Sequence, residues 1–121
     1  PNRTSHDWLS RDNKSVDEYV ASPLCGFVAS NQLYLDLANG VINTFQNEEM
    51  LKIPSDLPLL LIAGTKDPVG ENGEGVKALE KFLNKYLNSV SMILLSGLRH
   101  EILNEIEKDQ AINKIINFID Q

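Results

Sequence analysis

The sequence predicts an α/β fold built around a parallel pair of strands. A run of five apolar residues, 59–63, lies between turn signals and has the pattern of a strand covered on both faces. A helical pattern follows this run, and residues 90–95 form a second strand candidate. A helix between two neighbouring strands implies a crossover, which makes the strands parallel with a right-handed connection.

The composition excludes several classes of function. The chain has 121 residues, of which 42% are apolar and 23% charged, and its formal net charge is −6. This is typical of one globular domain at most, and the acidic balance argues against nucleic acid or an anionic membrane as a partner. No apolar run approaches the roughly 20 residues of a membrane span. A single cysteine and the lack of a signal peptide pattern favour a cytoplasmic location, although the chain begins with Pro1 and we expect its true N-terminus to lie upstream.

The first half of the chain is expected to contain two helices. Residues 15–18 (Ser-Val-Asp-Glu) have the spacing of a capping box, which predicts a short helix that stops before Pro23. Apolar residues recur at three- and four-residue steps over residues 30–45, which predicts a second helix. Gly40 lies inside that helix, where glycine costs about 1 kcal/mol relative to alanine.

The second half has the order strand, helix, strand, helix. The polar, glycine-rich segment 70–75 is expected to be a flexible lead into a helix that ends near Leu87. The last helix is expected at about 107–119, with isoleucines on one side. Two parallel strands do not make a stable sheet. We therefore expect the chain to be part of a larger α/β fold whose other strands lie on another polypeptide or are absent.

Asp67 and His100 are the residues that could carry chemistry. Each follows a predicted strand, so both lie at the edge of the sheet where α/β folds form their active crevice. A carboxylate that meets an imidazole there fixes its tautomer and stabilises its charged form, as a general base requires. Taken singly, Asp67 is more often a turn or helix-cap residue, and His100 is as often a hydrogen-bonded loop residue.

The sequence contains no recognisable nucleophile to complete a triad. The nucleophile motif G-x-S-x-G occurs nowhere, and the serines that precede Asp67 follow no apolar strand. Cys25 also lacks a preceding strand, and we interpret it as a buried, inert cysteine. Segment 70–75 matches neither a phosphate loop nor a calcium loop, and the two histidines lack metal-ligand spacing. No cofactor and no metal are therefore expected.

Several segments resemble one family. Residues 7–12, 16–20 and 23–27 resemble the region after strand six in bacterial α/β-hydrolases of the lysophospholipase, monoacylglycerol lipase-like or serine aminopeptidase-like branch. Residues 62–70 (Ile-Ala-Gly-Thr-Lys-Asp-Pro-Val-Gly) are similar to the acid loop of that branch. Residues 99–105 (Arg-His-Glu-Ile-Leu-Asn-Glu) are similar to its histidine loop. The resemblance covers nearly the whole chain.

The resemblance implies a fold, a domain division and two catalytic residues. The fold would be the C-terminal part of an α/β-hydrolase fold: the last two parallel strands, their flanking helices and the end of a helical cap. Residues 1–54 would form the end of the cap or lid and the return helix, and residues 55–121 the C-terminal βαβα part of the core. Asp67 matches the triad acid and His100 the triad base. The half with the nucleophile and the oxyanion hole is missing, so this chain alone is expected to be inactive.

The function implied by the resemblance is that of a serine hydrolase fragment. The intact protein would cleave carboxylic esters with an apolar acyl group, of the lysophospholipid or monoacylglycerol type. The expected partners are an ester or lipid-like small molecule and either the missing N-terminal half or a second copy of the chain, with no nucleic acid and no integral membrane contact. Peptide or epoxide cleavage uses the same two loops. The alternative is a non-catalytic α/β binding or interaction module, in which exposed apolar helix faces recruit a partner.

Overall fold

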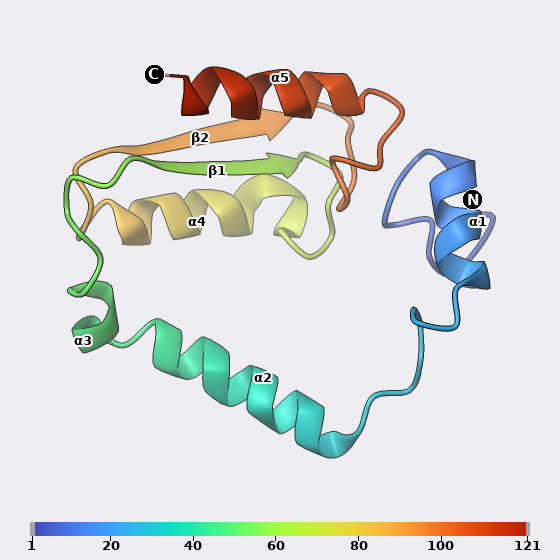
Figure 1. Cartoon of the computed structure of the whole chain (residues 1–121), viewed down its shortest axis with the longest axis horizontal. Coiled ribbons are helices and arrows are strands. Elements are labelled where there is room, and N and C mark those ends of the chain that lie inside the picture. The colour runs from blue at the N-terminus through green and yellow to red at the C-terminus, as the bar shows by residue number, and fades with distance from the viewer. Residues whose placement is uncertain (1, 121) are drawn as a thin grey trace.

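The computed structural model describes residues 2–120, which form a two-stranded parallel sheet between helices (Figure 1). Strand β1 (Leu59–Gly64) pairs with strand β2 (Val90–Leu95), and the register runs from Leu59 opposite Val90 to Gly64 opposite Leu95. Both strands lie where the apolar runs predict them. The α/β fold class and the parallel pairing are therefore confirmed, whereas the division of the chain at residue 54 stays a prediction.

One helix covers each face of the strand pair (Figure 1). Helix α4 (Glu74–Leu83) packs on one face and helix α5 (Lys108–Ile119) on the other, because successive strand side chains point in opposite directions. Helix α4 ends earlier than predicted, and a further turn carries the chain to Leu87. The buried residues form one cluster on each side: Met50, Leu83 and Leu87 on the α4 side, and Leu95, Leu98 and Ala111 on the α5 side.

Helix α1 (Asn13–Ala21) begins before the predicted capping box. Its N-cap is Asp12, whose side chain accepts a hydrogen bond from the backbone N–H of Lys14 at 2.9 Å. Ser15 lies in the first turn, and its hydroxyl donates to the Asp12 carboxylate at 3.3 Å. The prediction of a cap at Ser15 is wrong, because the Asp12 carboxylate already caps an earlier first turn by accepting from the backbone N–H of Lys14.

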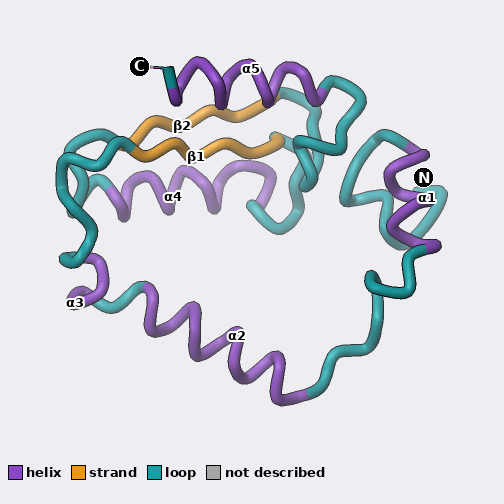
Figure 2. Tube along the Cα trace, viewed as in Figure 1, coloured by secondary structure: helices purple, strands orange, loops and turns teal. Residues whose placement is uncertain are grey.

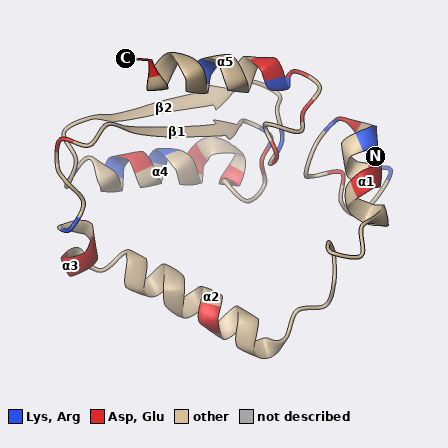
Figure 3. Cartoon of the chain, in the orientation of Figure 1, with Lys and Arg blue, Asp and Glu red and all other residues tan. Residues whose placement is uncertain are grey.

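Helix α2 (Asn31–Thr44) confirms the second predicted helix, and Gly40 does not interrupt it. Ser30 is its N-cap and accepts a hydrogen bond from the backbone N–H of Leu33 at 3.3 Å. The helix runs apart from the sheet (Figure 2), and none of its residues is buried. It carries one acidic and no basic residue (Figure 3), while large apolar side chains are exposed along it. That the missing half of the protein or a second copy of the chain covers these side chains stays a prediction.

The link from α2 to the sheet contains one helix that the sequence pattern does not predict. Helix α3 (Asn47–Met50) is a single turn that places Met50 in the core beside α4. The ring of Phe45, which caps α2, meets the ring of Phe82 on α4 with centroids 5.6 Å apart. No helix within residues 2–120 is long and apolar enough to cross a membrane, and the cytoplasmic location stays a prediction.

Segment 70–75 forms a hydrogen-bonded turn instead of the expected flexible lead. A 3₁₀ turn, η1 (Glu71–Gly73), precedes α4, and both Glu71 and Asn72 have positive φ angles, of 52° and 56°. The backbone N–H of Asn72 donates to the carbonyl of Asp67 at 2.8 Å, and that of Gly73 donates to the carbonyl of Gly70 at 2.9 Å. The turn thus folds the loop after β1 back toward Asp67.

Candidate functional site

The loops that follow β1 and β2 are joined by hydrogen bonds. The backbone N–H of Thr65 donates to the carbonyl of Leu95, and that of Lys66 to the carbonyl of Leu98, each at 2.9 Å. The hydroxyl of Thr65 accepts a hydrogen bond from the backbone N–H of Gly97 at 2.8 Å. These bonds continue the strand pairing past the end of the sheet, so the two loops stay side by side.

Gly64, the last residue of β1, allows the two loops to approach this closely. A Cβ atom at this position would lie less than 3.0 Å from the carbonyl oxygens of Leu98 and Arg99, a separation that real Cβ atoms essentially never show. Any other residue would therefore push the second loop away from the first. The sequence does not reveal this role of Gly64, because an isolated glycine at a strand end signals only a close backbone approach and not its partner.

Asp67 and His100 face each other across the joined loops. The Oδ1 atom of Asp67 lies 3.0 Å from Nδ1 of His100, although 33 residues separate the two along the chain. Asp67 is only 7% exposed, and its Oδ1 also accepts a hydrogen bond from the backbone N–H of Val69 at 2.9 Å. The side chain of His100 keeps 37% of its surface exposed. The structure therefore brings together the two residues that the sequence singles out.

This contact leaves Nε2 of His100 as the nitrogen that can react. An ionised carboxylate only accepts hydrogen bonds, so Nδ1 carries the proton and Nε2 carries the lone pair of the neutral ring. Within residues 2–120, no hydrogen bond engages Nε2. The ring can therefore accept a proton at that atom, and the carboxylate of Asp67 stabilises the imidazolium that forms.

Trp8 forms one wall of this arrangement. Its indole lies beside the imidazole of His100, with ring centroids 5.1 Å apart and 44° between the planes. The backbone also takes part, since the N–H of Glu101 donates to the carbonyl of Leu9 at 2.8 Å. The segment before α1 thus packs directly on the loop that carries His100, which the pattern of apolar residues does not predict.

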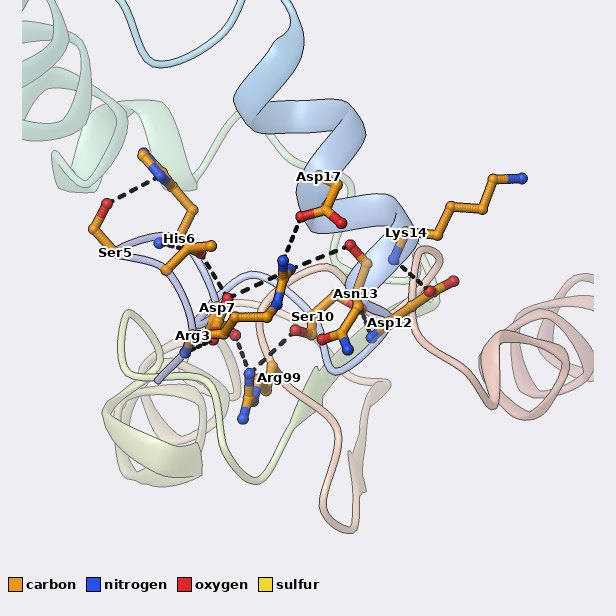
Figure 4. A network of polar contacts seen from close by, with 11 residues as sticks. Arg3, Ser5, His6, Asp7, Ser10, Asp12, Asn13, Lys14, Asp17 and Arg99 are labelled. Carbon is orange, nitrogen blue, oxygen red and sulfur yellow. Dashed lines mark hydrogen bonds and ion pairs between the residues drawn. The ribbon is translucent and has the colours of Figure 1, made fainter. Parts of the chain in front are cut away.

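Arg99, the residue before His100, is anchored to the same segment. Its guanidinium donates to the backbone carbonyls of Asp7 and Ser10, the latter at 3.1 Å (Figure 4). The buried hydroxyl of Ser10 donates to the carbonyl of Asn104 at 2.8 Å. Residues at both ends of the chain therefore share one polar network around the histidine loop.

Asp7 is fixed within this network by donors of its own segment. Its carboxylate accepts hydrogen bonds from the hydroxyl of Thr4, at 2.6 Å, and from the backbone N–H of Arg3. The Thr4 hydroxyl is the largest cause, and together these bonds hold the pKa of Asp7 below its ordinary value of 3.8, although burial acts in the opposite direction. The side chain therefore stays charged down to more acidic pH than an exposed aspartate.

The described residues supply no partner for Nε2 of His100. Within residues 2–120, no serine or cysteine hydrogen-bonds to the imidazole, and no group of three His, Cys, Asp or Glu side chains is placed to hold a metal ion. The interpretation of Cys25 as buried is wrong, because the turn that carries it is open on one side. Cys25 is half-buried and lines a cavity of about 380 Å³ beside α1, together with Tyr19 and Glu101.

Comparison with known proteins gives a family match over most of the chain. The family described as serine aminopeptidase, S33, matches residues 1–107. No curated protein sequence matches the chain. A solved structure of a highly thermostable carboxyl esterase from Bacillus coagulans, in complex with glycerol, is 32% identical with a TM-score of 0.82. The match covers 98% of this chain and 39% of the esterase.

Two further solved structures have the same fold. A lipase in its open form is 29% identical with a TM-score of 0.80, over 98% of this chain and 41% of the lipase. The monoacylglycerol lipase of Paleococcus ferrophilus is 22% identical with a TM-score of 0.65, over 93% of this chain and 41% of that lipase, and it shows the fold alone. The chain thus spans 39–41% of the length of these three structures.

Proposed function

The chain belongs to the serine aminopeptidase S33 family and has the α/β-hydrolase fold, and on this basis we propose that the protein containing it is a serine hydrolase of carboxylic esters. The observation that carries the proposal is the 3.0 Å contact between Asp67 and His100 at the ends of two parallel strands. The carboxyl esterase and the lipase, which match 98% of this chain, support an ester as substrate.

In the proposed mechanism, His100 transfers the serine proton, and Asp67 orients the imidazole of His100. A serine from another part of the protein attacks the ester carbonyl, and its hydroxyl proton passes to Nε2 of His100. Asp67 accepts the Nδ1–H hydrogen bond and stabilises the imidazolium. The imidazolium then gives its proton to the departing alcohol, which leaves an acyl-serine. A water molecule, deprotonated by the same Nε2, hydrolyses the acyl-serine and restores the free serine and the neutral ring.

We propose further that the acyl group is apolar, as in a lysophospholipid or a monoacylglycerol. The open-form lipase is similar over nearly the whole chain, which supports a lipid-like ester. Helix α2 exposes several large apolar side chains, and a surface of this kind suits an acyl chain better than a charged group. The exposed residues on this helix are Leu33, Tyr34, Leu35, Leu37, Val41 and Ile42.

The test uses the protein as expressed from its own gene, with a p-nitrophenyl ester as substrate. His100→Ala and Asp67→Asn should each lower kcat by about 10³–10⁴-fold with little loss of folding. The matched controls are His6→Ala and Asp56→Asn, which change the same residue types away from the site. Because the ring of His6 packs on Tyr19 and not on Asp67, its loss should leave kcat near the wild-type value.

The outcomes separate the proposed enzyme from a binding module. Turnover that survives both His100→Ala and Asp67→Asn would refute the roles of the two residues. A wild-type protein that neither hydrolyses esters nor reacts with a fluorophosphonate probe would favour the non-catalytic module. Comparison of acetyl, octanoyl and palmitoyl esters with an aminoacyl anilide then tests the acyl preference and separates esterase from peptidase chemistry.

A further inference from the structure

Glu105 is the most deeply buried charged side chain among residues 2–120. The residue is 1% exposed, and its side chain has no exposed surface. Removing a carboxylate from water is costly unless hydrogen bonds or an opposite charge compensate it. A fully buried glutamate in an irregular loop therefore needs its partners identified.

Three N–H groups converge on the carboxylate of Glu105. Its Oε1 accepts a hydrogen bond from the backbone N–H of Arg99 at 2.7 Å. Its Oε2 accepts two more from Arg11, one from the backbone N–H at 3.2 Å and one from Nε of the guanidinium at 3.0 Å. One side chain thus joins the segment before α1 to the residue that immediately precedes His100.

This arrangement closes a short loop around His100. Residues 99 and 105 are hydrogen-bonded to each other, and His100 is the first residue between them. The peptide unit between Leu98 and Arg99 cannot rotate without breaking the bond from the Arg99 N–H to Oε1. This bond fixes the backbone of Arg99, from which the chain enters His100, and the imidazole has to lie within 3.0 Å of Asp67.

We propose that Glu105 is a positioning residue for His100, and this inference rests on the proposed function. It acts through the backbone of Arg99 and does not touch the imidazole, the substrate or the reacting atoms. Arg11 compensates its charge, while the Arg99 N–H transmits its position to the histidine. Because proton transfer requires close alignment, a displacement of about 1 Å at a remote residue can cost about 10²-fold in rate.

The test compares two glutamates that both contact Arg11. Glu105→Gln replaces one carboxylate oxygen by an NH₂ group, which donates and cannot accept, so the remaining oxygen cannot serve both the Arg99 and the Arg11 donors. Glu107→Gln is the matched control, because Glu107 also pairs with Arg11 but is 44% exposed on its side chain. In the protein expressed from its own gene, Glu105→Gln should lower kcat for a p-nitrophenyl ester by about 10–10²-fold with KM within about two-fold. Glu107→Gln should leave both constants near the wild-type values.

A spectroscopic signature separates positioning from a loss of stability. The proton on Nδ1 of His100, held by Asp67, should give a downfield ¹H resonance in the wild-type protein. This resonance should broaden or disappear in Glu105→Gln and persist in Glu107→Gln, at a temperature at which circular dichroism shows that both are folded. Glu105→Asp keeps the charge but is one methylene shorter, so it should fold and still show a lowered kcat. If Glu105→Gln does not fold, Glu105→Asp tests the positioning role in its place.

The possible results have distinct meanings. Folded Glu105→Gln or Glu105→Asp with the kcat and the Nδ1–H resonance of the wild type would overturn the positioning role. An equal loss of kcat in Glu107→Gln would also overturn it, since the effect would then belong to Arg11. A wild-type protein that is inactive, or a His100→Ala variant that keeps full activity, would instead refute the proposed function.

Discussion

The indole of Trp8 and the imidazole of His100 lie beside each other, with ring centroids 5.1 Å apart and 44° between their planes. The two residues come from opposite ends of the chain. An aromatic pair in this geometry contributes about 0.5–1.5 kcal/mol beyond the area that it buries. The contact adds a third constraint on the imidazole, next to the carboxylate of Asp67 and the backbone of the histidine loop.

Replacement of the indole should release the ring of His100. In Trp8→Leu, the resonances of the His100 ring protons should move, because the ring current of the indole is lost. In the protein expressed from its own gene, kcat for an ester should fall by up to about ten-fold, which corresponds to the upper end of an aromatic contact. Trp8→Phe keeps an aromatic face, so its kcat should fall less than that of Trp8→Leu. NMR and steady-state kinetics provide the two measurements.

The control for this change is Phe82→Leu. The ring of Phe82 packs against Phe45 and Tyr86, in the core on the α4 side of the sheet. Its loss should lower the melting temperature and leave the His100 resonances in place. If the two variants change those resonances equally, the Trp8 contact has no specific effect on the histidine.

Replacement of glycine by alanine should change the stability of the chain in opposite directions at two positions. Gly64→Ala places a Cβ less than 3.0 Å from the carbonyl oxygens of Leu98 and Arg99, and backbone atoms cannot yield as a flexible side chain can. We expect a loss of about 3 kcal/mol in the free energy of unfolding, at the upper end of overpacking. A Cβ atom at Gly40 meets no atom within 4 Å, and Gly40 lies inside α2. Gly40→Ala should therefore raise the free energy of unfolding by about 1 kcal/mol. Urea denaturation of both variants checks the two signs.

The strands and the pairing of Asp67 with His100 could be predicted because local rules determine them. A continuous apolar run between turn signals indicates a strand covered on both faces, and parallel strands end at the same edge of a sheet. Two polar residues that follow two such strands must therefore lie near each other. The 3.0 Å separation is a detail that only the fold supplies.

The surroundings of His100 could not be predicted, because their partners are distant in the sequence. Ser10 and Asn104 are 94 residues apart, as are Arg11 and Glu105, and no periodicity marks any of the four. The cap of α1 is predicted at the wrong residue for a different, local reason. Two residues offered a suitable side chain, and the backbone N–H of Asp12 is additionally fixed by a hydrogen bond to the Ser10 hydroxyl at 2.9 Å.

Loss of the Thr65 hydroxyl should separate the two loops. Thr65→Val keeps the shape of the side chain but leaves the backbone N–H of Gly97 without its acceptor. An unsatisfied, partly buried donor costs about 1–3 kcal/mol. The control is Thr44→Val, because the Thr44 hydroxyl donates to the Gly40 carbonyl on the exposed surface of α2 and its loss should cost less than about 0.5 kcal/mol. Thermal melts that shift equally for both variants would contradict this prediction.

The stability of the chain should depend on pH through Asp7. Hydrogen bonds from Thr4 and Arg3 hold the folded-state pKa of Asp7 below its ordinary value of 3.8. The folded state therefore binds this proton less readily than the unfolded state does, and the stabilising contribution is fully present above the unfolded-state pKa. It is lost as the pH falls from there through the folded-state pKa, where the carboxylate becomes protonated.

Asp7→Asn isolates this contribution, because it removes the charge and keeps the shape of the side chain. At pH 7 the variant should be less stable than the wild type, and the difference should shrink as the pH falls below about 4, where the wild-type carboxylate also loses its charge. Asp56→Asn, at an exposed residue, should show no such convergence. Because Asp7 also provides a carbonyl to the guanidinium of Arg99, the protection of the His100 amide, measured relative to its intrinsic exchange rate at each pH, should fall in acid in the wild type. A wild type and an Asp7→Asn variant whose unfolding free energies stay parallel from pH 7 to pH 3 would show that Asp7 is not the titrating group.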